Sequence, residues 1–231
     1  MKIYQASLFL NVLKRYSELF PDEPLNVLIS LAYNESERKG FIKDYRHLIA
    51  SLIADSGAWS VAQGKSTLTL REVASHLLIW GKHYDHYFNF DTDFSTEGFN
   101  NNIANQVALE HVGLTPVPVV HNFHNNEIEF YVKSRKYDWL ALGSSQASNF
   151  KDIKYAVDKI KRWGNPSIKI HWFGGSKFDW LCELPIASCD TTSWAATGMY
   201  GSIMYWNPAN PNINKADQIY IGGRIKELKE S

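Results

Sequence analysis

Short apolar runs recur along the chain and predict a series of buried strands. Each run is well short of the length of a typical helix, and runs of this kind are typical of strands covered on both faces. The runs lie at residues 26–33, 52–54, 87–90, 115–120, 139–142, 167–172 and 184–189.

Between these runs, apolar residues recur every three or four positions, which places them on one face of a helix. In the stretch 69–82, for example, Leu70, Val73 and Leu77 share a face. Gly113 stands where a helix is expected to end. The pattern predicts helices over residues 38–50, 69–82, 96–111 and 151–163.

Regular alternation of strands and helices is typical of a parallel sheet covered by helices. The predicted strands, with an eighth expected in 201–206 or 218–222, fit a (β/α)₈ TIM-like barrel better than a smaller open sheet. With 231 residues the barrel is compact, because such barrels typically need about 250. The turn-rich stretch 207–212 predicts an irregular or hairpin-like last unit. We expect one domain over residues 1–231.

Composition narrows the class of protein. Hydrophobic residues make up 45% of the chain and aromatic residues 14%, which suits a substantial core and excludes a disordered chain. The 24 Lys and Arg balance the 24 Asp and Glu, so the formal net charge is zero. This balance argues against a nucleic-acid binder driven by charge alone. The basic side chains in the stretch 151–162 can still form a local surface that binds phosphates.

The cysteines and the apolar stretches bound the environment of the protein. Cys182 and Cys189 are too few for a four-cysteine zinc site or a disulfide framework, and the paired histidines lack a third ligand. We therefore expect no metal and no cofactor. No apolar stretch reaches the roughly 18 residues of a membrane span, and the N-terminal run is too short for a signal peptide. We expect a soluble, cytoplasmic protein without membrane contact.

Polar residues follow most of the apolar runs. Because the strands of a parallel barrel end on one face, these residues are expected to surround one pocket. A carboxylate followed by small residues at a strand tip is typical of catalytic sites in α/β folds. The residues concerned are Asp55-Ser56-Gly57, Asp91, Asp93, His121, Gly143-Ser144-Ser145, His171-Trp172-Phe173-Gly174 and Asp190.

These side chains suit chemistry at the C1 carbon of a sugar. An oxocarbenium-like transition state needs one carboxylate as nucleophile or electrostatic partner and a second group that moves a proton. A third carboxylate can accept hydrogen bonds from the N–H edge of a guanine-like base, and glycine turns expose backbone N–H groups. Trp59, Trp172 and Phe173 can stack on a flat ring.

Each of these residues also has a purely structural interpretation. Asp55 and Asp190 can cap the helices that follow them, and Asp91 or Asp93 can cap a helix that begins near residue 96. The histidines at the strand ends can be buried, hydrogen-bonded residues of the core. These alternatives stay open at the level of the sequence.

The order of the motifs carries a resemblance to a known family. Leu52-Ile53-Ala54-Asp55-Ser56-Gly57 resembles the D-S-G-G-F segment of tRNA-guanine transglycosylases. The resemblance covers residues 26–206, and it departs from the family pattern at Ala58 and in lacking the zinc-binding cysteines of the tRNA enzymes. The chain is most similar to the phage and bacterial 7-deazaguanine DNA transglycosylases, through the further motifs Phe90-Asp91, Ala141-Leu142-Gly143 and Asp190-Thr191-Thr192-Ser193-Trp194.

The resemblance implies an enzyme that exchanges guanine in DNA for a 7-deazaguanine base such as preQ0 through a covalent aspartyl intermediate. Asp190 matches the nucleophile and Asp55 the acid/base aspartate. Asp91 matches the residue that recognises the base, and the turn at Gly143 and Ser144 is expected to donate backbone N–H groups to it. The other residues expected to bind substrate are His121, in place of a base-contacting glutamine, and Ser56, Gly57, Trp172 and Phe173.

The expected partners are guanine-containing DNA and the free deazaguanine base, and a homodimer or an accessory protein would supply further DNA contacts. Three other functions remain open. They are the same exchange on tRNA, a barrel N- or O-glycosidase that uses Asp55 and Asp190, and a nucleic-acid binder without catalysis.

Overall fold

The computed structural model describes residues 1–95, 97–143, 149–163, 166–175, 177–195, 201–212 and 215–220. Within this part of the chain, eight parallel strands form one curled sheet in the order β4-β3-β2-β1-β8-β7-β6-β5. A further parallel bridge joins Phe88, next to β4, to Val117, just before β5. The strands are β1 (Lys2–Ala6), β2 (Leu25–Ser30), β3 (Ile49–Asp55), β4 (His86–Tyr87), β5 (Val119–Val120), β6 (Trp139–Leu142), β7 (Lys169–Trp172) and β8 (Ser188–Thr191).

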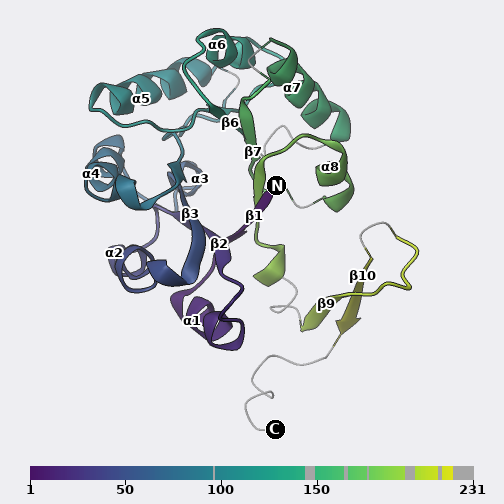
Figure 1. Ribbon diagram of the computed structural model, residues 1–231. Helices are drawn as coiled ribbons and strands as arrows, with labels where there is room; N and C mark the ends of the chain where they lie inside the picture. The colour runs from purple at the N-terminus through teal and green to yellow at the C-terminus, as the bar shows by residue number, and fades with distance from the viewer. Residues whose placement is uncertain are drawn as a thin grey trace.

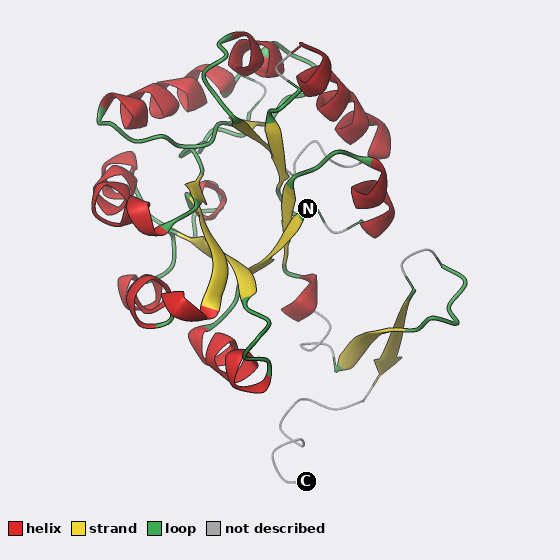
Figure 2. Cartoon of the chain, in the orientation of Figure 1, coloured by secondary structure: helices red, strands yellow, loops and turns green. Residues whose placement is uncertain are grey.

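Helices surround the strands, as Figures 1 and 2 show. The short α3 is an exception, since it lies inside the ring in Figure 1. Among the described residues, no helix has both the length and the apolar character needed to cross a membrane. The helices are α1 (Leu10–Leu19), α2 (Glu35–Lys39), α3 (Ala58–Ala62), α4 (Leu70–Trp80), α5 (Phe99–His111), α6 (Glu127–Lys133), α7 (Phe150–Trp163) and α8 (Phe178–Glu183).

Alternation along each strand decides which side chains reach the inside of the curled sheet. On β3, Leu52 and Ala54 pack with the helices, whereas Ile53 packs inside. The inner cluster comprises Tyr4, Ala6, Leu28, Ile53, Phe88, Val117, Val119 and Ala141. Asp55 has the same parity as Ile53 and therefore reaches the inner side at the strand tip. On β8, Cys189 belongs to an outer cluster, so Asp190 also points inward.

The predicted helices 69–82 and 151–163 are confirmed by α4 and α7. A capping box begins α4: the Thr69 hydroxyl accepts from the Glu72 N–H, and the Glu72 carboxylate accepts from the Thr69 N–H at 2.8 Å. The prediction of a helix over 96–111 is confirmed from Phe99 onward.

The predicted helix over 38–50 is wrong as a single element. Helix α2 ends at Lys39, a π-turn follows at Gly40–Asp44, and a 3₁₀ turn spans Arg46–Leu48. Ile49 is already in β3 and pairs with Leu25 of β2. Phe41, Ile42 and Ile49 are buried in the outer core as expected. The helix, however, gives way to short turns after Lys39, and the last two residues of the predicted range belong to β3.

The prediction of the eighth strand is also wrong. The missing strand is β1 at the N-terminal end, which lies between β2 and β8. Strands β9 (Ser202–Trp206) and β10 (Ala216–Tyr220) instead pair with each other antiparallel and lie outside the ring in Figure 1. A hairpin near the C-terminal end was expected, but it is separate from the eight-stranded sheet.

Candidate active site at the carboxyl ends of the strands

A pocket of about 530 Å³ opens at the carboxyl ends of the parallel strands. It receives side chains from the tips of at least six strands, which lie far apart in the sequence. Among the residues singled out from the sequence, it is lined by Asp55, Trp59, Asp91, His121, Gly143, Phe173, Gly174 and Asp190. The curled sheet thus brings three carboxylates and a histidine to one site.

The Asp190 carboxylate is held from one side by two donors. The Gly174 N–H donates to Asp190 Oδ1 at 3.1 Å, and His171 Nε2 lies 3.2 Å from the same oxygen. The other ring nitrogen of His171, Nδ1, lies 2.9 Å from the Ser188 hydroxyl. Both contacts fall on Oδ1, so within the described part of the chain Oδ2 is left for other partners. The structural interpretation of His171, as a buried and hydrogen-bonded histidine at a strand end, is thereby confirmed.

Asp91 forms a second pair, with His121. His121 Nε2 is hydrogen-bonded to Asp91 Oδ2, and both side chains are buried. Burial alone lowers the pKa of His121, but the hydrogen bond and charge of Asp91, with the charge of Glu127, outweigh it and raise the pKa overall. The Glu127 carboxylate also accepts the backbone N–H of His121 at 2.7 Å. The pair therefore favours the protonated form of the His121 imidazole.

Asparagines of α5 hold the loop that carries Asp91. The Asn105 amide donates to the Phe90 carbonyl at 2.7 Å, and the Asn102 amide donates to the Asp93 carbonyl at 2.8 Å. The Asp93 carboxylate accepts from the Ser95 N–H at 3.0 Å, so this residue serves the local loop. The run of asparagines at residues 100–102 and 105 is the signal in the sequence that points to this support.

Asp55 is the carboxyl whose protonation is most perturbed. Its pKa is raised from the ordinary 3.8 to about 7, first by burial and then by the charges of Asp91 and Asp190. Hydrogen bonds from the Gly57 N–H and the Ser30 hydroxyl act in the opposite direction. Asp55 is therefore suited to exchange a proton near neutral pH, as a general acid or base must.

The small residues after Asp55 shape the turn. Gly57 has φ +81°, and a Cβ there would lie 2.9 Å from Ala32, so both conformation and space require glycine. Its N–H donates to Asp55 Oδ2 at 3.3 Å. Ser56 is buried with a hydroxyl that has no partner among the described residues. Ser56 and Gly57 are not among the described residues that line the pocket, and the substrate contacts expected of them stay predictions.

Gly143 lines the pocket, but its backbone differs from the expectation. Its N–H donates to the Val120 carbonyl at 2.9 Å, as part of the pairing next to β5 and β6, and is not free for a base. What glycine provides here is space, because a Cβ at this position would lie 2.7 Å from His121 Nδ1. Ser144, expected to share the turn, lies outside the described residues.

The aromatic residues divide between core and pocket. Trp172 was expected to stack on substrate, but it points to the helices and stacks on Trp180 at 6.0 Å between ring centroids. Phe173 lines the pocket, as does Trp59, whose exposed fraction is 57%. Phe94 also lines it, with edge contacts to the rings of Trp59 and His121. The correction at Trp172 follows from strand parity, because neighbours on a strand face opposite sides.

Several hydroxyls of the pocket were missed from the sequence. They are Ser7, Ser30, Tyr33 and Ser60. Burial raises the pKa of Tyr33, and a hydrogen bond with Ser7 partly counters it. Ser7 has φ +58°, an uncommon conformation for serine that follows directly after β1. Because β1 itself was not predicted, the sequence did not indicate that Ser7 lies at the tip of a strand.

No group of three or more His, Cys, Asp or Glu residues suited to a metal ion is present within the described ranges. None of the described residues that line the pocket is Lys or Arg. A ligand of the pocket therefore meets carboxylates, hydroxyls, a histidine and aromatic rings.

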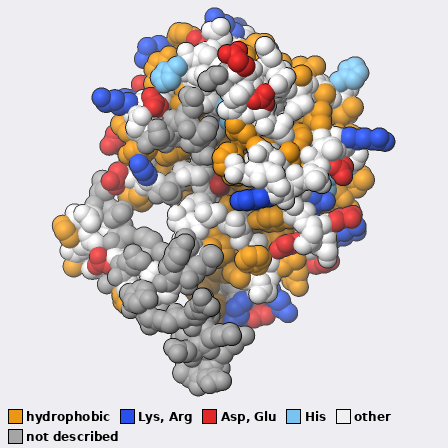
Figure 3. Space-filling view, turned by 180° about the vertical axis from the view of Figure 1, so that it is seen from behind, with side chains coloured by type: hydrophobic (Ala, Val, Ile, Leu, Met, Phe, Trp, Pro, Cys, Tyr) orange, Lys and Arg blue, Asp and Glu red, His pale blue; other side chains and the backbone are white. Residues whose placement is uncertain are grey.

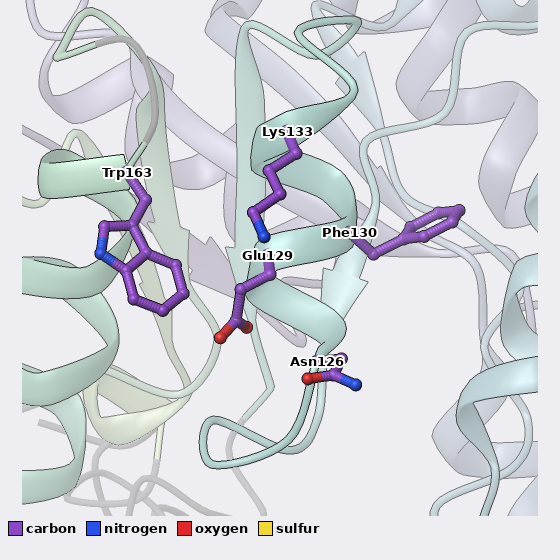
Figure 4. Close-up of a pocket in the computed structure, with 5 residues that line it drawn as sticks. All are labelled: Asn126, Glu129, Phe130, Lys133 and Trp163. Atoms are coloured by element: carbon purple, nitrogen blue, oxygen red, sulfur yellow. The ribbon is translucent and has the colours of Figure 1, made fainter.

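A second hollow, of about 490 Å³, lies between α6 and α7 on the outside of the ring. Figure 4 shows Glu129 and Lys133 on the side of α6 that faces Trp163, with Phe130 on the other side. Glu129 is paired with Lys159 at 2.9 Å, and Lys133 lies over the Trp163 ring. These charges are matched within the protein, so this hollow offers less chemistry than the pocket at the strand ends.

The basic stretch of α7 is largely occupied by internal contacts. Lys159 is buried and donates to the carbonyls of Phe123 and Asn125, and Lys161 donates to the Pro166 carbonyl at 3.0 Å. Lys154 pairs with an aspartate one turn away at 3.3 Å. The helix therefore has fewer lysines available to bind phosphates than its sequence indicates.

The sequence matches no protein-family model and no curated protein. The residues of the pocket and the motif resemblance are therefore the features that point to a function.

Proposed function

We propose that the protein is a transglycosylase that exchanges guanine in DNA for a 7-deazaguanine base such as preQ0. The observation that carries the proposal is the meeting of Asp55, Asp91 and Asp190 in one pocket, with the pKa of Asp55 raised to about 7 by burial and by the other two charges. Carboxylates with different protonation behaviour can divide the roles of nucleophile and acid/base between them.

The same proposal includes a complete (β/α)₈ barrel. The bridge between Phe88 and Val117 supports it, together with two backbone hydrogen bonds beside it. The Val117 N–H donates to the Tyr87 carbonyl at 2.8 Å, and the Asn89 N–H donates to the Val117 carbonyl at 3.0 Å. These contacts join the two edges of the curled sheet and would close the cylinder whose rim carries the pocket.

In the proposed reaction Asp190 is the nucleophile. Oδ2 bonds to C1′ of the target nucleotide while the bond from C1′ to N9 of guanine breaks, and the bonding electrons leave with guanine. Asp55, in its protonated form, supplies the proton that neutralises the leaving guanine. The hydrogen bonds of Gly174 and His171 to Oδ1 support this role, because they keep the other oxygen available.

The second half of the reaction reverses the first with a different base. The incoming deazaguanine gives its N9 proton to the Asp55 carboxylate, and N9 then bonds to C1′ and displaces Asp190. Asp55 thereby returns to its protonated form and the enzyme is regenerated. A pKa of about 7, caused by burial and neighbouring charges, suits a group that must both give and take a proton.

Asp91 and His121 are proposed to bind the base. A carboxylate can accept from the ring and amino N–H groups of a guanine-like base, and its burial strengthens such hydrogen bonds. Phe94, Phe173 and Trp59 supply rings on which a flat base can stack. The target nucleotide has to leave its stack to reach the pocket.

DNA is proposed as the nucleic acid, on the motif resemblance and the absence of the zinc-binding cysteines in the sequence. The face in Figure 3 carries basic and acidic side chains interspersed, in keeping with a formal net charge of zero. Non-specific attraction to phosphates is therefore expected to be weak, and a second copy or an accessory protein would add DNA contacts.

The test is base exchange in vitro. Guanine-containing DNA or tRNA is incubated with labelled guanine or preQ0, and the nucleosides are analysed after digestion. We expect label in DNA with the wild type, none with Asp190→Ala, and normal incorporation with Asp158→Asn, whose carboxylate lies on the outside of α7 and pairs with Lys154.

The other outcomes separate the alternatives. Label in tRNA alone would keep the mechanism and change the nucleic acid. Release of guanine without incorporation of label would indicate an N-glycosidase. Absence of both reactions with a folded protein would contradict the proposal.

A further inference from the structure

Beneath the pocket, a hydrogen-bonded chain extends the contact between His171 and Asp190 to Ser188, a residue to which the proposed reaction gives no role. Ser188, His171 and Asp190 come from the neighbouring strands β7 and β8, where His171 and Ser188 are direct partners in the register. Asp190 follows Ser188 by two residues and therefore points to the same side. The chain runs from the Ser188 hydroxyl through Nδ1 and Nε2 of His171 to Asp190 Oδ1, at 2.9 and 3.2 Å.

The imidazole of His171 has little freedom to move. It is 1% exposed and does not line the pocket. The rings of Phe88, Phe173 and Tyr4 surround it, with centroids at 4.8, 4.7 and 6.2 Å. A ring in this setting can change its hydrogen bonds only by rotating against packed aromatic neighbours.

The partners also define the tautomer of a neutral His171. An ionised carboxylate can only accept, so Nε2 carries the proton that is directed to Asp190. Nδ1 is then an acceptor, and the Ser188 hydroxyl, which can donate, fills it. Loss of that hydroxyl would leave a buried nitrogen unpaired and remove the preference for this tautomer.

We propose that His171, oriented by Ser188, is a positioning residue that holds Oδ1 of Asp190 and turns Oδ2 toward the substrate. The naming of Asp190 as the nucleophile rests on the proposed function, whereas the orientation of its carboxylate does not. The Gly174 N–H shares the same oxygen and completes the support. The arrangement favours one orientation of the Asp190 carboxylate, because both contacts fall on the same oxygen.

The experiment compares four variants with the wild type. Ser188→Ala removes the partner of Nδ1, His171→Asn removes the donor to Asp190, and His171→Gln restores a donor of similar reach. Ser51→Ala is the matched control, since Ser51 is another fully buried serine inside the sheet, bonded to Tyr4 at 2.9 Å and outside the pocket.

The first readout is independent of any activity. The chemical shift of the Asp190 carboxyl carbon is measured by NMR in protein labelled at its aspartates, with Asp190→Asn to assign the signal. Asp55 and Asp91 face the same pocket, so all three signals are followed together. We expect the Asp190 signal to move in Ser188→Ala and further in His171→Asn, because its hydrogen bonds change, and to stay unchanged in Ser51→Ala.

The second readout is kinetic. We expect kcat for base exchange to fall about ten-fold in Ser188→Ala and up to about 100-fold in His171→Asn, with KM for the base unchanged and partial recovery in His171→Gln. If His171→Asn does not fold, Ser188→Ala against Ser51→Ala decides the question.

An unchanged Asp190 signal in a folded Ser188→Ala protein, with kinetics equal to those of Ser51→Ala, would overturn the inference. A shifted Asp190 signal in a protein without any exchange activity would support the positioning role and at the same time contradict the proposed function. The two failures are therefore distinguishable.

Discussion

Two aspartate–histidine pairs serve the same pocket, but their hydrogen bonds are completed differently. In the pair of Asp190 and His171, both ring nitrogens have partners, because Ser188 takes the one that Asp190 leaves. In the pair of Asp91 and His121, the nitrogen Nδ1 is buried and has no partner among the described residues. His171 lies beneath the pocket, whereas His121 forms part of its wall.

This difference indicates a division of labour. A pair whose hydrogen bonds are all internal holds one geometry whether or not a ligand is present. A buried donor or acceptor left unpaired costs about 1–3 kcal/mol, which a ligand atom of the right kind recovers. We infer that the Asp190 side of the pocket is built for the chemical step and that the Asp91 side is built for recognition.

The largest effect is expected at Asp190. Asp190→Asn keeps the shape of the side chain but removes the nucleophile, so kcat for base exchange should fall about 10⁴-fold. Rates of the variant and of Asp158→Asn are measured under single-turnover conditions. If the variant keeps a tenth of the wild-type rate, Asp190 is not the nucleophile, and the Asp190 side of the pocket is not specialised for the chemical step.

Asp55 interacts with the charges of both Asp91 and Asp190, and its protonation is expected to make the stability of the protein depend on pH. Because its folded-state pKa is raised to about 7 by burial and the two neighbouring charges, the folded protein holds a proton that the unfolded chain releases above about pH 4. Stability should therefore fall as pH rises from about 4 to 7, by a few kcal/mol at most, and stay level above that.

Asp55→Asn should remove most of this slope and be more stable than the wild type at pH 8. Urea unfolding between pH 4.5 and 8.5 measures it, with Asp158→Asn as the control that keeps the slope. Equal slopes in the wild type and Asp55→Asn would mean that Asp55 is ionised throughout this range and is not the acid of the reaction.

A smaller effect is expected at Asp91. Asp91→Asn replaces a charged acceptor by a neutral amide, so KM for the free base should rise about 10- to 100-fold, with a lesser change in kcat. Initial rates at varied base concentration separate the two constants. A loss of kcat equal to that of Asp190→Asn would show that recognition and chemistry are not divided between the pairs.

The smallest effect is expected from Gly143→Ala. The new Cβ would lie 2.7 Å from His121 Nδ1 and 3.3 Å from the Val120 carbonyl, so His121 has to move. We expect about 1–3 kcal/mol of lost stability and roughly a ten-fold weaker binding of the base. Gly81→Ala is the control, because Gly81 has φ −52° and its new Cβ would make only an ordinary contact, at 3.5 Å from the Tyr87 ring. Thermal melts and base titrations of both variants would reveal whether the space beside His121 matters.

Much of the candidate site could be predicted from the sequence because strand alternation is local. Asp55 and Asp190 follow short apolar runs, and a parallel sheet brings such tips to one edge. Alternation also means that neighbours such as Trp172 and Phe173 point to opposite sides, but it does not reveal which side is the inner one. Both rings were expected in the pocket, and only Phe173 lines it.

The sequence by itself determined the class of fold, most of the strands and the polar residues at their ends, since these depend on periodicity over a few residues. Only the tertiary structure decided the place of β1, whose five residues become a strand by pairing with β2 and β8. Tertiary pairing also consumed the Gly143 N–H and joined His171 to Ser188 and Asp190. Such contacts depend on register between distant strands, and no local pattern encodes that register.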